Sequence, residues 1–155
     1  METKQINSNF EKGLIQITPA IESDDRRNGV DAWIDGNIPI AFRKRPDVSI
    51  DQYNGKVLTI RIGKEAIRGY ISFEYDKLLN GQFRAVLYFF KLKGHLVICA
   101  TQDIVAYLRE HPLEDLDIHP NRYGEADLIG ISPSDLKSAL VIPLNLPFPS
   151  LMETA

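Results

Sequence analysis

The chain contains a single cysteine, Cys99, and no long apolar run. One thiol cannot form an internal disulfide, so we expect a protein of a reducing compartment, with a cytoplasmic location. The longest apolar runs, such as AVLYFF and HLVICA, are much shorter than a membrane-spanning helix, and no basic-then-apolar leader opens the chain. The sequence therefore predicts a protein that is neither membrane-bound nor secreted.

Several motifs of known chemistry are also missing. The sequence has no glycine-rich phosphate loop, no serine nucleophile elbow and no pair of cysteines spaced for zinc. His111 and His119 flank several acids, but their spacing matches no tight pattern of metal ligands. These absences disfavour the commonest classes of nucleotide-binding enzyme, serine hydrolase and zinc protein.

The composition is that of one globular domain. The 155 residues include 44% hydrophobic and 25% charged residues, ordinary values for a chain that can bury a sizeable core. We treat residues 1–155 as a single domain. Its core is expected over residues 5–110, and an irregular, proline-rich region over residues 111–155.

The spacing of apolar residues predicts an α/β (α+β) fold, in which helices flank a central mixed β-sheet. Ser72 and Thr101 are the expected caps of two of the helices, and Lys93-Gly94 the turn of a buried hairpin. The expected helices cover residues 4–11, 72–81 and 102–111, with a further helix starting at 132, and the expected strands cover 14–22, 30–34, 38–42, 56–62, 84–92 and 95–100.

The charges are unevenly distributed, although the formal net charge is only −3. Residues 43–68 hold seven cations against three acids, whereas residues 110–135 hold seven acids against Arg122 alone. A concentrated basic segment is typical of a surface that contacts nucleic-acid phosphates. The alternative is an ordinary solvated face. The candidate DNA-binding residues are Arg43, Lys44, Arg45, Lys56, Arg61, Lys64 and Arg68.

The segment GVDAWIDGNIPIAFRKR, residues 29–45, predicts a β-hairpin with a three-residue loop at residues 35–37. Gly36 and Asn37 are the residues expected to take positive φ. Both residues of a pair then share a face, and successive pairs alternate between the two faces of the hairpin. The apolar face would consist of Val30, Ala32, Ile34, Ile38, Ile40 and Phe42, and the opposite, water-exposed face of Asp31, Trp33, Asp35, Ala41, Arg43 and Arg45.

On that second face the register brings Asp31 and Arg43 together as diagonal neighbours. A carboxylate is a hard ligand that suits Mg²⁺, and a neighbouring cation can stabilise a phosphate. Glu11, on the first helix, is a candidate for a second carboxylate over the sheet. A simple ion pair between strands is the other interpretation of Asp31 and Arg43.

This order of elements resembles the core of the PD-(D/E)XK nucleases: a helix with a glutamate, a strand with an aspartate, a hairpin into a further strand, then a helix. Restriction enzymes, Holliday junction resolvases and a cyanobacterial group I intron homing endonuclease share that core. The small size and the basic β insertion make the chain most similar to the homing endonuclease. The resemblance covers residues 5–110, on GVDAWI followed by IPIAFRK.

Carried over residue by residue, the resemblance matches Asp31 to the motif aspartate and Glu11 to the helix glutamate. Two positions depart from the motif: Ala41 stands where Glu or Asp is expected, and Arg43 where Lys is expected. Arginine keeps the charge but does not readily release a proton to act as a base. The missing acid is therefore expected from Glu11, or from Glu74 with Lys77 nearby.

The resemblance implies a sequence-specific DNA endonuclease that hydrolyses phosphodiester bonds in double-stranded DNA with Mg²⁺ (or Mn²⁺). It implies Asp31 and Glu11 as metal ligands, with Arg43 as the third catalytic residue. Cutting a duplex takes two active sites, so we expect a homo-oligomer, a dimer or a tetramer. The alternatives are a DNA-binding protein of the same fold that does not cut, or a nuclease like the Holliday junction resolvases.

Overall fold

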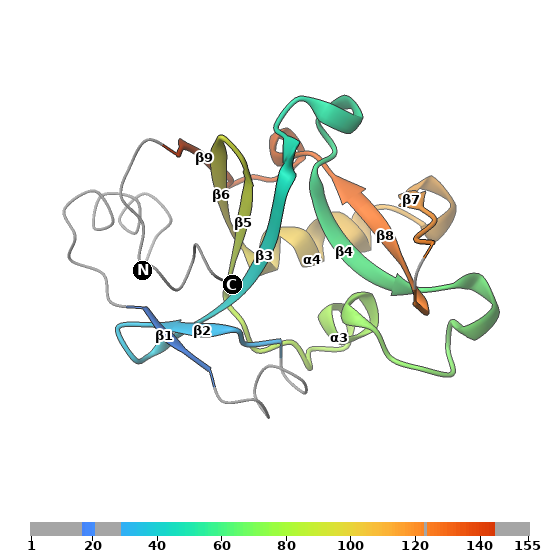
Figure 1. Ribbon diagram of the computed structural model, residues 1–155. Helices are drawn as coiled ribbons and strands as arrows, with labels where there is room; N and C mark the ends of the chain where they lie inside the picture. Colours follow the sequence, from blue (N-terminus) through green and yellow to red (C-terminus); the bar gives the residue numbers. More distant parts are fainter. Residues whose placement is uncertain (1–16, 21–28, 123, 145–155) are drawn as a thin grey trace.

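The computed structural model describes residues 17–20, 29–122 and 124–144, which form a mixed α+β fold with two β-sheets and few helices (Figure 1). The larger sheet has six strands in the order β1-β2-β3-β5-β6-β9. Its strands are β1 (Ile17–Pro19), β2 (Ala32–Ile34), β3 (Ile38–Ser49), β5 (Leu87–Lys93), β6 (His95–Ala100) and β9 (Leu140–Pro143).

The smaller sheet has three antiparallel strands in the order β4-β8-β7, and it packs beside the larger one. Figure 1 shows α4 behind the strands of the two sheets and α3 below them, and both helices contribute to the core that the sheets share. The remaining elements are β4 (Leu58–Gly63), β7 (Asp117–His119), β8 (Ala126–Ile131), α3 (Glu74–Leu79), α4 (Thr101–Glu110) and the 3₁₀ turns Gln52–Gly55, Glu65–Ile67, Leu113–Asp115 and Pro133–Asp135.

The expected hairpin is confirmed in its register, because Ala32 pairs with Ile40 and Ile34 with Ile38. The loop differs in one detail. Positive φ falls on Asp35 (52°) and Gly36 (75°), and Asn37 does not take it. Aspartate, like asparagine, tolerates the left-handed region, so the sequence did not decide which residue of the loop adopts it.

The strand β3 pairs with β5 in parallel, and this arrangement positions the candidate site. Ala41 lies beside Tyr88 and Arg43 beside Phe90 in the register of the two strands. Parallel neighbours need a long crossover connection. Here the crossover contains β4 and α3, so it brings α3 to the same side of β3 as the side chain of Arg43.

Both faces of the six-stranded sheet are buried, which corrects the expectation of a water-exposed face. The predicted apolar face is confirmed for Ala32, Ile34 and Ile40, which join β5, β6 and β9 residues in one core cluster, with Ile38 and Phe42 at its edge. Val30, however, belongs to the core on the other face, as does Ala41, and Trp33 packs against it. The smaller sheet and the helices pack on that second face, and a two-residue period does not reveal what covers a face.

The C-terminal region is more regular than expected. Residues 117–119 and 126–131 form β7 and β8, and residues 140–143 add β9 to the edge of β6. The helix expected to start at Ser132 is a single 3₁₀ turn. The predicted caps are also wrong, since Phe73 rather than Ser72 precedes α3, and Thr101 is the first residue of α4.

The predicted first helix, with Glu11, lies outside the described residues, and so does most of the strand expected at 14–22. The hairpin of residues 87–100, with its turn at Gly94, is confirmed. Among the described residues, no helix is long and apolar enough to cross a bilayer.

Candidate functional site

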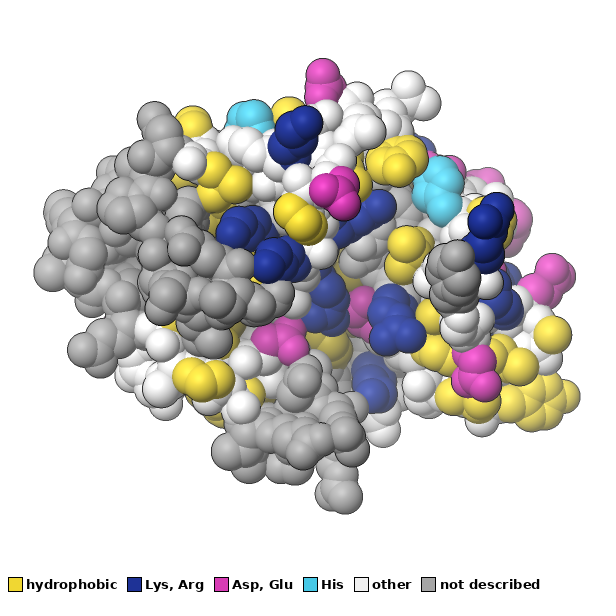
Figure 2. Space-filling view, viewed as in Figure 1, with side chains coloured by type: hydrophobic (Ala, Val, Ile, Leu, Met, Phe, Trp, Pro, Cys, Tyr) yellow, Lys and Arg dark blue, Asp and Glu magenta, His cyan; other side chains and the backbone are white. Residues whose placement is uncertain are grey.

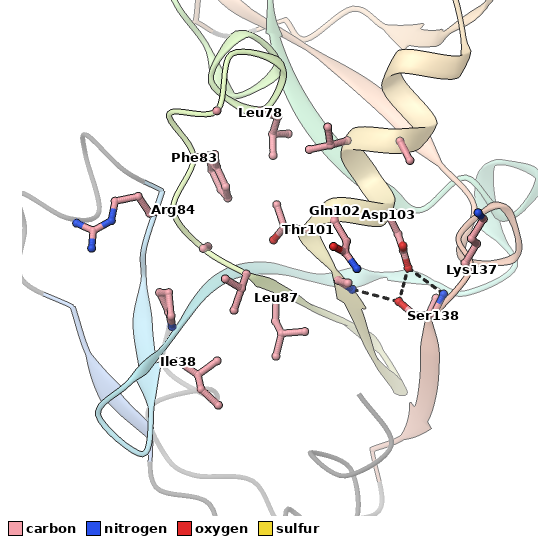
Figure 3. Close-up of a pocket in the computed structure, with 18 of the residues that line it drawn as sticks. Ile38, Leu78, Phe83, Arg84, Leu87, Thr101, Gln102, Asp103, Lys137 and Ser138 are labelled. Atoms are coloured by element: carbon pink, nitrogen blue, oxygen red, sulfur yellow. Dashed lines mark hydrogen bonds between the residues drawn. The ribbon is translucent and has the colours of Figure 1, made fainter. Parts of the chain in front are cut away.

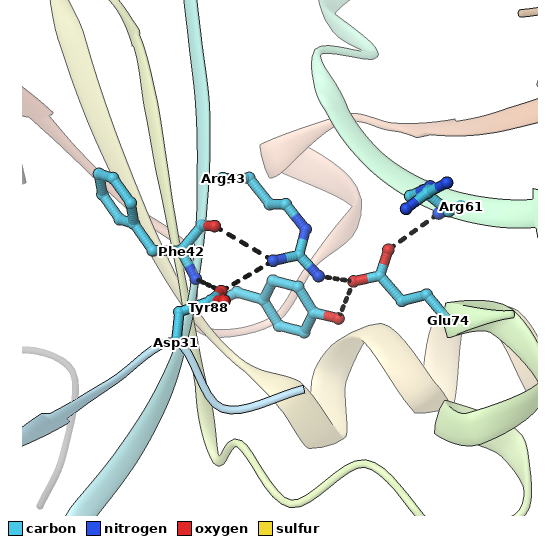
Figure 4. Close-up of polar contacts among 6 residues, drawn as sticks. All are labelled: Asp31, Phe42, Arg43, Arg61, Glu74 and Tyr88. Atoms are coloured by element: carbon cyan, nitrogen blue, oxygen red, sulfur yellow. Dashed lines mark hydrogen bonds and ion pairs between the residues drawn. The ribbon is translucent and has the colours of Figure 1, made fainter. Parts of the chain in front are cut away.

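The guanidinium of Arg43 joins two carboxylates that are far apart in the sequence (Figure 4). Its Nη1 donates to Oδ2 of Asp31 at 2.9 Å, and its Nη2 donates to Oε2 of Glu74. Nη1 also donates to the carbonyl oxygen of Phe42 at 3.1 Å. The expected meeting of Asp31 and Arg43 is therefore confirmed, and Glu74 is the second acid that comes to the pair.

Asp31 is held in place by the backbone of β3 as well as by Arg43. Its amide donates to the carbonyl of Ile40 at 2.8 Å, and its Oδ2 accepts the amide of Phe42 at 2.6 Å. Because β2 begins at Ala32, the amide of Phe42 has no strand partner on this side, and the carboxylate takes that place. Asp31 thus has a structural role besides any chemical one.

Glu74 is the first residue of α3 and the more buried of the two acids, with 5% of its side chain exposed against 24% for Asp31. Its Oε2 accepts the hydroxyl of Tyr88 at 2.5 Å, and its Oε1 accepts the backbone amide of Arg61 at 2.9 Å. A buried carboxylate needs such partners to offset its lost hydration. The side chain of Glu74 is therefore fixed by α3, β4 and β5 together.

The electrostatics of the group keep Arg43 charged and Tyr88 neutral. Burial on its own would lower the pKa of Arg43, but the carboxylates of Glu74 and Asp31 outweigh it and raise that pKa above its usual value. Burial, reinforced by Glu74, raises the pKa of Tyr88 well above its usual value. Arg43 therefore cannot serve as a base near neutral pH, and Tyr88 serves as a hydrogen-bond donor.

Tyr88 is the site residue that the sequence did not single out. It lies in the apolar run LYFF of β5, where period and composition indicate only a core strand. Its ring is fully buried, stacks on Phe83 and Phe90, and lies 5.5 Å from the guanidinium carbon of Arg43. Its hydroxyl is the polar end of an otherwise apolar side chain.

Position 41, where the motif expects an acid, is inside the core. Ala41 has no exposed surface, and it lies beside Tyr88 in the sheet register. A carboxylate at this position would replace a small apolar group in a close-packed interior. Of the two expected substitutes, Glu74 reaches the site, and Glu11 lies outside the described residues.

The seven candidate DNA-binding residues do not share one patch. Side chains alternate along a strand, so Lys44 lies on the opposite face of β3 from Arg43 and Arg45. Arg45 lies over the ring of Tyr53 at 5.7 Å and donates to the carbonyl of Val57 at 3.2 Å. The basic run 43–45 is thus divided between two faces.

The remaining four cations lie on the smaller sheet and the turns beside it. Arg61 is exposed on β4, while Arg68 donates to the carbonyl of Gly63 at 2.8 Å. Figure 2 shows Lys and Arg side chains gathered over β3 and β4, with acidic side chains between them. Two of the cations have acidic neighbours: Lys56 lies 4.0 Å from Asp117, and Lys64 lies 3.1 Å from Asp127.

The donors of the group suit a hard divalent cation. Mg²⁺ is usually held by one or two carboxylates together with phosphate oxygens and water, and Asp31 and Glu74 supply two carboxylates around one positive charge. Across the described ranges no three metal-ligating side chains cluster. Two protein carboxylates are thus the donors that the described residues offer, and Arg43 lies between them.

An open pocket lies elsewhere on the molecule, at the start of α4 (Figure 3). It has a volume of about 1410 Å³, and Leu78, Phe83 and Leu87 line its apolar side. At its polar side the carboxylate of Asp103 accepts hydrogen bonds from the backbone and the hydroxyl of Ser138. None of Asp31, Arg43 and Glu74 lines this pocket, so it is separate from the candidate site.

The comparisons with known proteins leave the family open: no family model, no curated protein and no solved structure matches this chain.

Proposed function

We propose that the protein is a divalent-metal-dependent, sequence-specific endonuclease of double-stranded DNA, with its active site at Asp31, Arg43 and Glu74. The observation that carries this proposal is the convergence of two carboxylates from distant segments on one guanidinium, at the edge of a basic face. Such a group offers both a cation site and a positive charge for a phosphodiester.

Each residue has a role in this proposal. Asp31 and Glu74 would hold Mg²⁺ or Mn²⁺, and Arg43 would bind a non-bridging oxygen of the scissile phosphate. When bound, the cation supplies Lewis-acid chemistry, which polarises the phosphodiester and lowers the pKa of an attacking water. Tyr88 and the amide of Arg61 position the carboxylate of Glu74.

The order of elements supports the nuclease-like assignment from Asp31 onward. A hairpin leads from Asp31 into β3, and a helix follows before the next strand of the same sheet. This is the order on which the resemblance to the PD-(D/E)XK core rests. In the proposal, Glu74 takes the place of the motif acid absent at Ala41, and Glu11 stays a further candidate ligand.

A second function, DNA binding without cleavage, is favoured by one specific observation. Arg43 already pairs with both Asp31 and Glu74, and the position of the motif acid is filled by a buried alanine. A protein of this kind would keep the basic face and the ion-pair group but bind no catalytic cation. The two functions predict opposite results in a cleavage assay.

The decisive assay incubates the protein with supercoiled plasmid in Mg²⁺, in Mn²⁺ and in EDTA. The nuclease proposal expects nicked and linear products in both metals and none in EDTA. Asp31→Asn and Glu74→Gln should abolish cleavage, whereas Lys93→Gln, which removes an exposed cation at the end of β5, should not. Glu11→Gln tests the additional ligand in the same assay.

If no variant and no metal gives cleavage, a gel-shift series in EDTA decides whether the protein binds DNA. Phosphate contacts release counterions, so the affinity should fall steeply as the salt concentration rises. Cutting both strands also predicts a homo-oligomer, which light scattering of the purified protein measures directly.

A further inference from the structure

Arg43 occupies the position of a cation between two carboxylates. Its guanidinium contacts Asp31, Glu74 and the carbonyl of Phe42, and it lies over the ring of Tyr88. A divalent cation shared by the same two carboxylates would compete with the guanidinium for the same oxygen atoms. The side chain of Arg43 is 27% exposed, so it has a route toward solvent.

Both carboxylates have anchors that do not depend on Arg43. Oδ2 of Asp31 accepts the amide of Phe42 at 2.6 Å, and the two oxygens of Glu74 accept the amide of Arg61 and the hydroxyl of Tyr88. If Arg43 moves away, these contacts still hold the two acids near their positions. Both carboxylates therefore continue to face the space that the guanidinium fills, and a metal ion that takes its place would have to draw them closer together.

The charges show when the replacement of Arg43 by a divalent cation at the two carboxylates is favourable. Arg43 with Asp31 and Glu74 carries one positive and two negative charges, a net charge of −1. A divalent cation added to this partly buried group changes the net charge to +1, with the guanidinium repelled by the metal. A phosphodiester contributes one negative charge, which neutralises the group and gives Arg43 a new partner.

We infer that Arg43 is the resident cation of this site, and that a divalent metal binds between Asp31 and Glu74 only when a phosphodiester draws Arg43 off the carboxylates. The inference rests on the proposed function, because it concerns the same site and a nucleic-acid substrate. It adds that the affinity for the metal depends on DNA: metal binding is weak in the free protein and strong in the complex with DNA.

Thermodynamic linkage gives the inference a reciprocal consequence. If DNA raises the affinity for the metal by some factor, the metal raises the affinity for DNA by the same factor. A phosphate oxygen that ligates the metal directly would also couple the two affinities, so the exchange is reported by a coupling that is larger in wild type than in Arg43→Gln. The coupling is therefore a measurable quantity, independent of any cleavage.

The test measures Mn²⁺ binding by the loss of the electron paramagnetic resonance signal of free Mn²⁺. In the absence of DNA, wild-type protein should bind Mn²⁺ weakly, and Arg43→Gln should bind it at least about tenfold tighter, an effect of about 1.4 kcal/mol. The double variant Arg43→Gln with Asp31→Asn should lose this gain. Lys93→Gln, the matched loss of one positive charge on the neighbouring strand β5, should behave as wild type.

A second measurement on the wild-type protein does not depend on the folding of any variant. Addition of a short DNA duplex should raise the affinity of the protein for Mn²⁺ about tenfold or more, after subtraction of Mn²⁺ bound by the duplex alone. Equal affinity with and without the duplex, or equal affinity of folded Arg43→Gln and wild type, overturns the inference.

The outcomes separate this inference from the proposed function. Cleavage of plasmid together with DNA-independent Mn²⁺ binding would support the nuclease proposal and would contradict the role of Arg43 as resident cation. Coupled binding of Mn²⁺ and DNA that is smaller in Arg43→Gln, without cleavage, keeps that role and argues against the nuclease.

Discussion

The hydroxyl of Tyr88 donates to the carboxylate of Glu74 at 2.5 Å, in the interior between β5 and α3. This contact connects the parallel pair of the larger sheet to the helix of the crossover. It also holds one oxygen of Glu74 toward Arg43. The position of the candidate site therefore depends on a side chain that has no exposed surface.

Replacement of Tyr88 by Phe tests this contact. At pH 7 the variant should be less stable by about 1.5–3 kcal/mol, the contribution of a hydrogen bond to a charged group. The raised pKa of Tyr88 means that its hydroxyl ionises in the unfolded chain near pH 10 but stays protonated in the folded protein. Wild type should therefore lose stability above about pH 10 relative to Tyr88→Phe.

The measurement is urea denaturation at pH 7, 9 and above 10. The difference in unfolding free energy between the two proteins should be constant up to about pH 9 and shrink above about pH 10. A difference that stays constant at alkaline pH would contradict the raised pKa of the buried Tyr88 hydroxyl.

Two substitutions of Asp31 separate its structural role from its proposed chemical role. Asp31→Asn keeps an oxygen acceptor for the amide of Phe42, so its stability should remain within about 1 kcal/mol of wild type. Asp31→Ala leaves that amide without its acceptor and should cost about 1–3 kcal/mol. Both variants lose the carboxylate, so both should lose Mn²⁺-dependent cleavage. Thermal unfolding and plasmid nicking of the same samples give the two readouts.

Gly29 is predicted to be the least replaceable glycine next to the site. It has a φ of +71°, and a Cβ added there would lie 2.0 Å from the ring of Phe83, which stacks on Tyr88. Gly29→Ala should therefore cost about 3 kcal/mol or more, from backbone strain and a steric clash together.

Gly36 provides the matched control for this prediction. It also has a positive φ, of +75°, but a Cβ there meets nothing within 4 Å. Gly36→Ala should cost only the backbone term, about 1 kcal/mol. Equal losses for the two variants, measured by urea denaturation, would show that the ring of Phe83 moves aside easily.

Cations beside the candidate site and on the opposite face of β3 are predicted to contribute differently to DNA binding. Arg61→Gln, on β4 beside Glu74, should weaken binding and reduce the slope of log affinity against log salt by about one. Lys44→Gln removes the same charge from the opposite face of β3 and should leave the slope near the wild-type value. Fluorescence anisotropy with a labelled duplex in EDTA, over a salt series, measures both slopes.

The hairpin of residues 32–40 was predictable because its register follows from local alternation. Ala32 and Ile40 face each other in the structure as the pattern requires. The burial of Ala41 was not predictable in the same way, since it results from β4, β8 and the helices packing on that face. Alternation distinguishes two faces, and distant segments decide which of them meets water.

Glu74 shows a similar limit. The sequence placed it on a helix and left it as one of two possible second acids. Its approach to Arg43 depends on the path of a crossover, and no local pattern encodes that path. The strand β8 was missed for a related reason. Its partner β4 precedes it by more than sixty residues, and the segment before it is rich in acids and proline.

The parallel pairing of β3 with β5 has a consequence for how the protein folds. Ile40 lies beside Leu87, so this part of the sheet closes only after the intervening chain, including α3, is in place. Contacts of such large sequence separation lower folding rates, because loop-closure entropy is lost before the contacts form. The carboxylate pair should consequently assemble late during folding, and binding of a cation to it would report the last steps of that process.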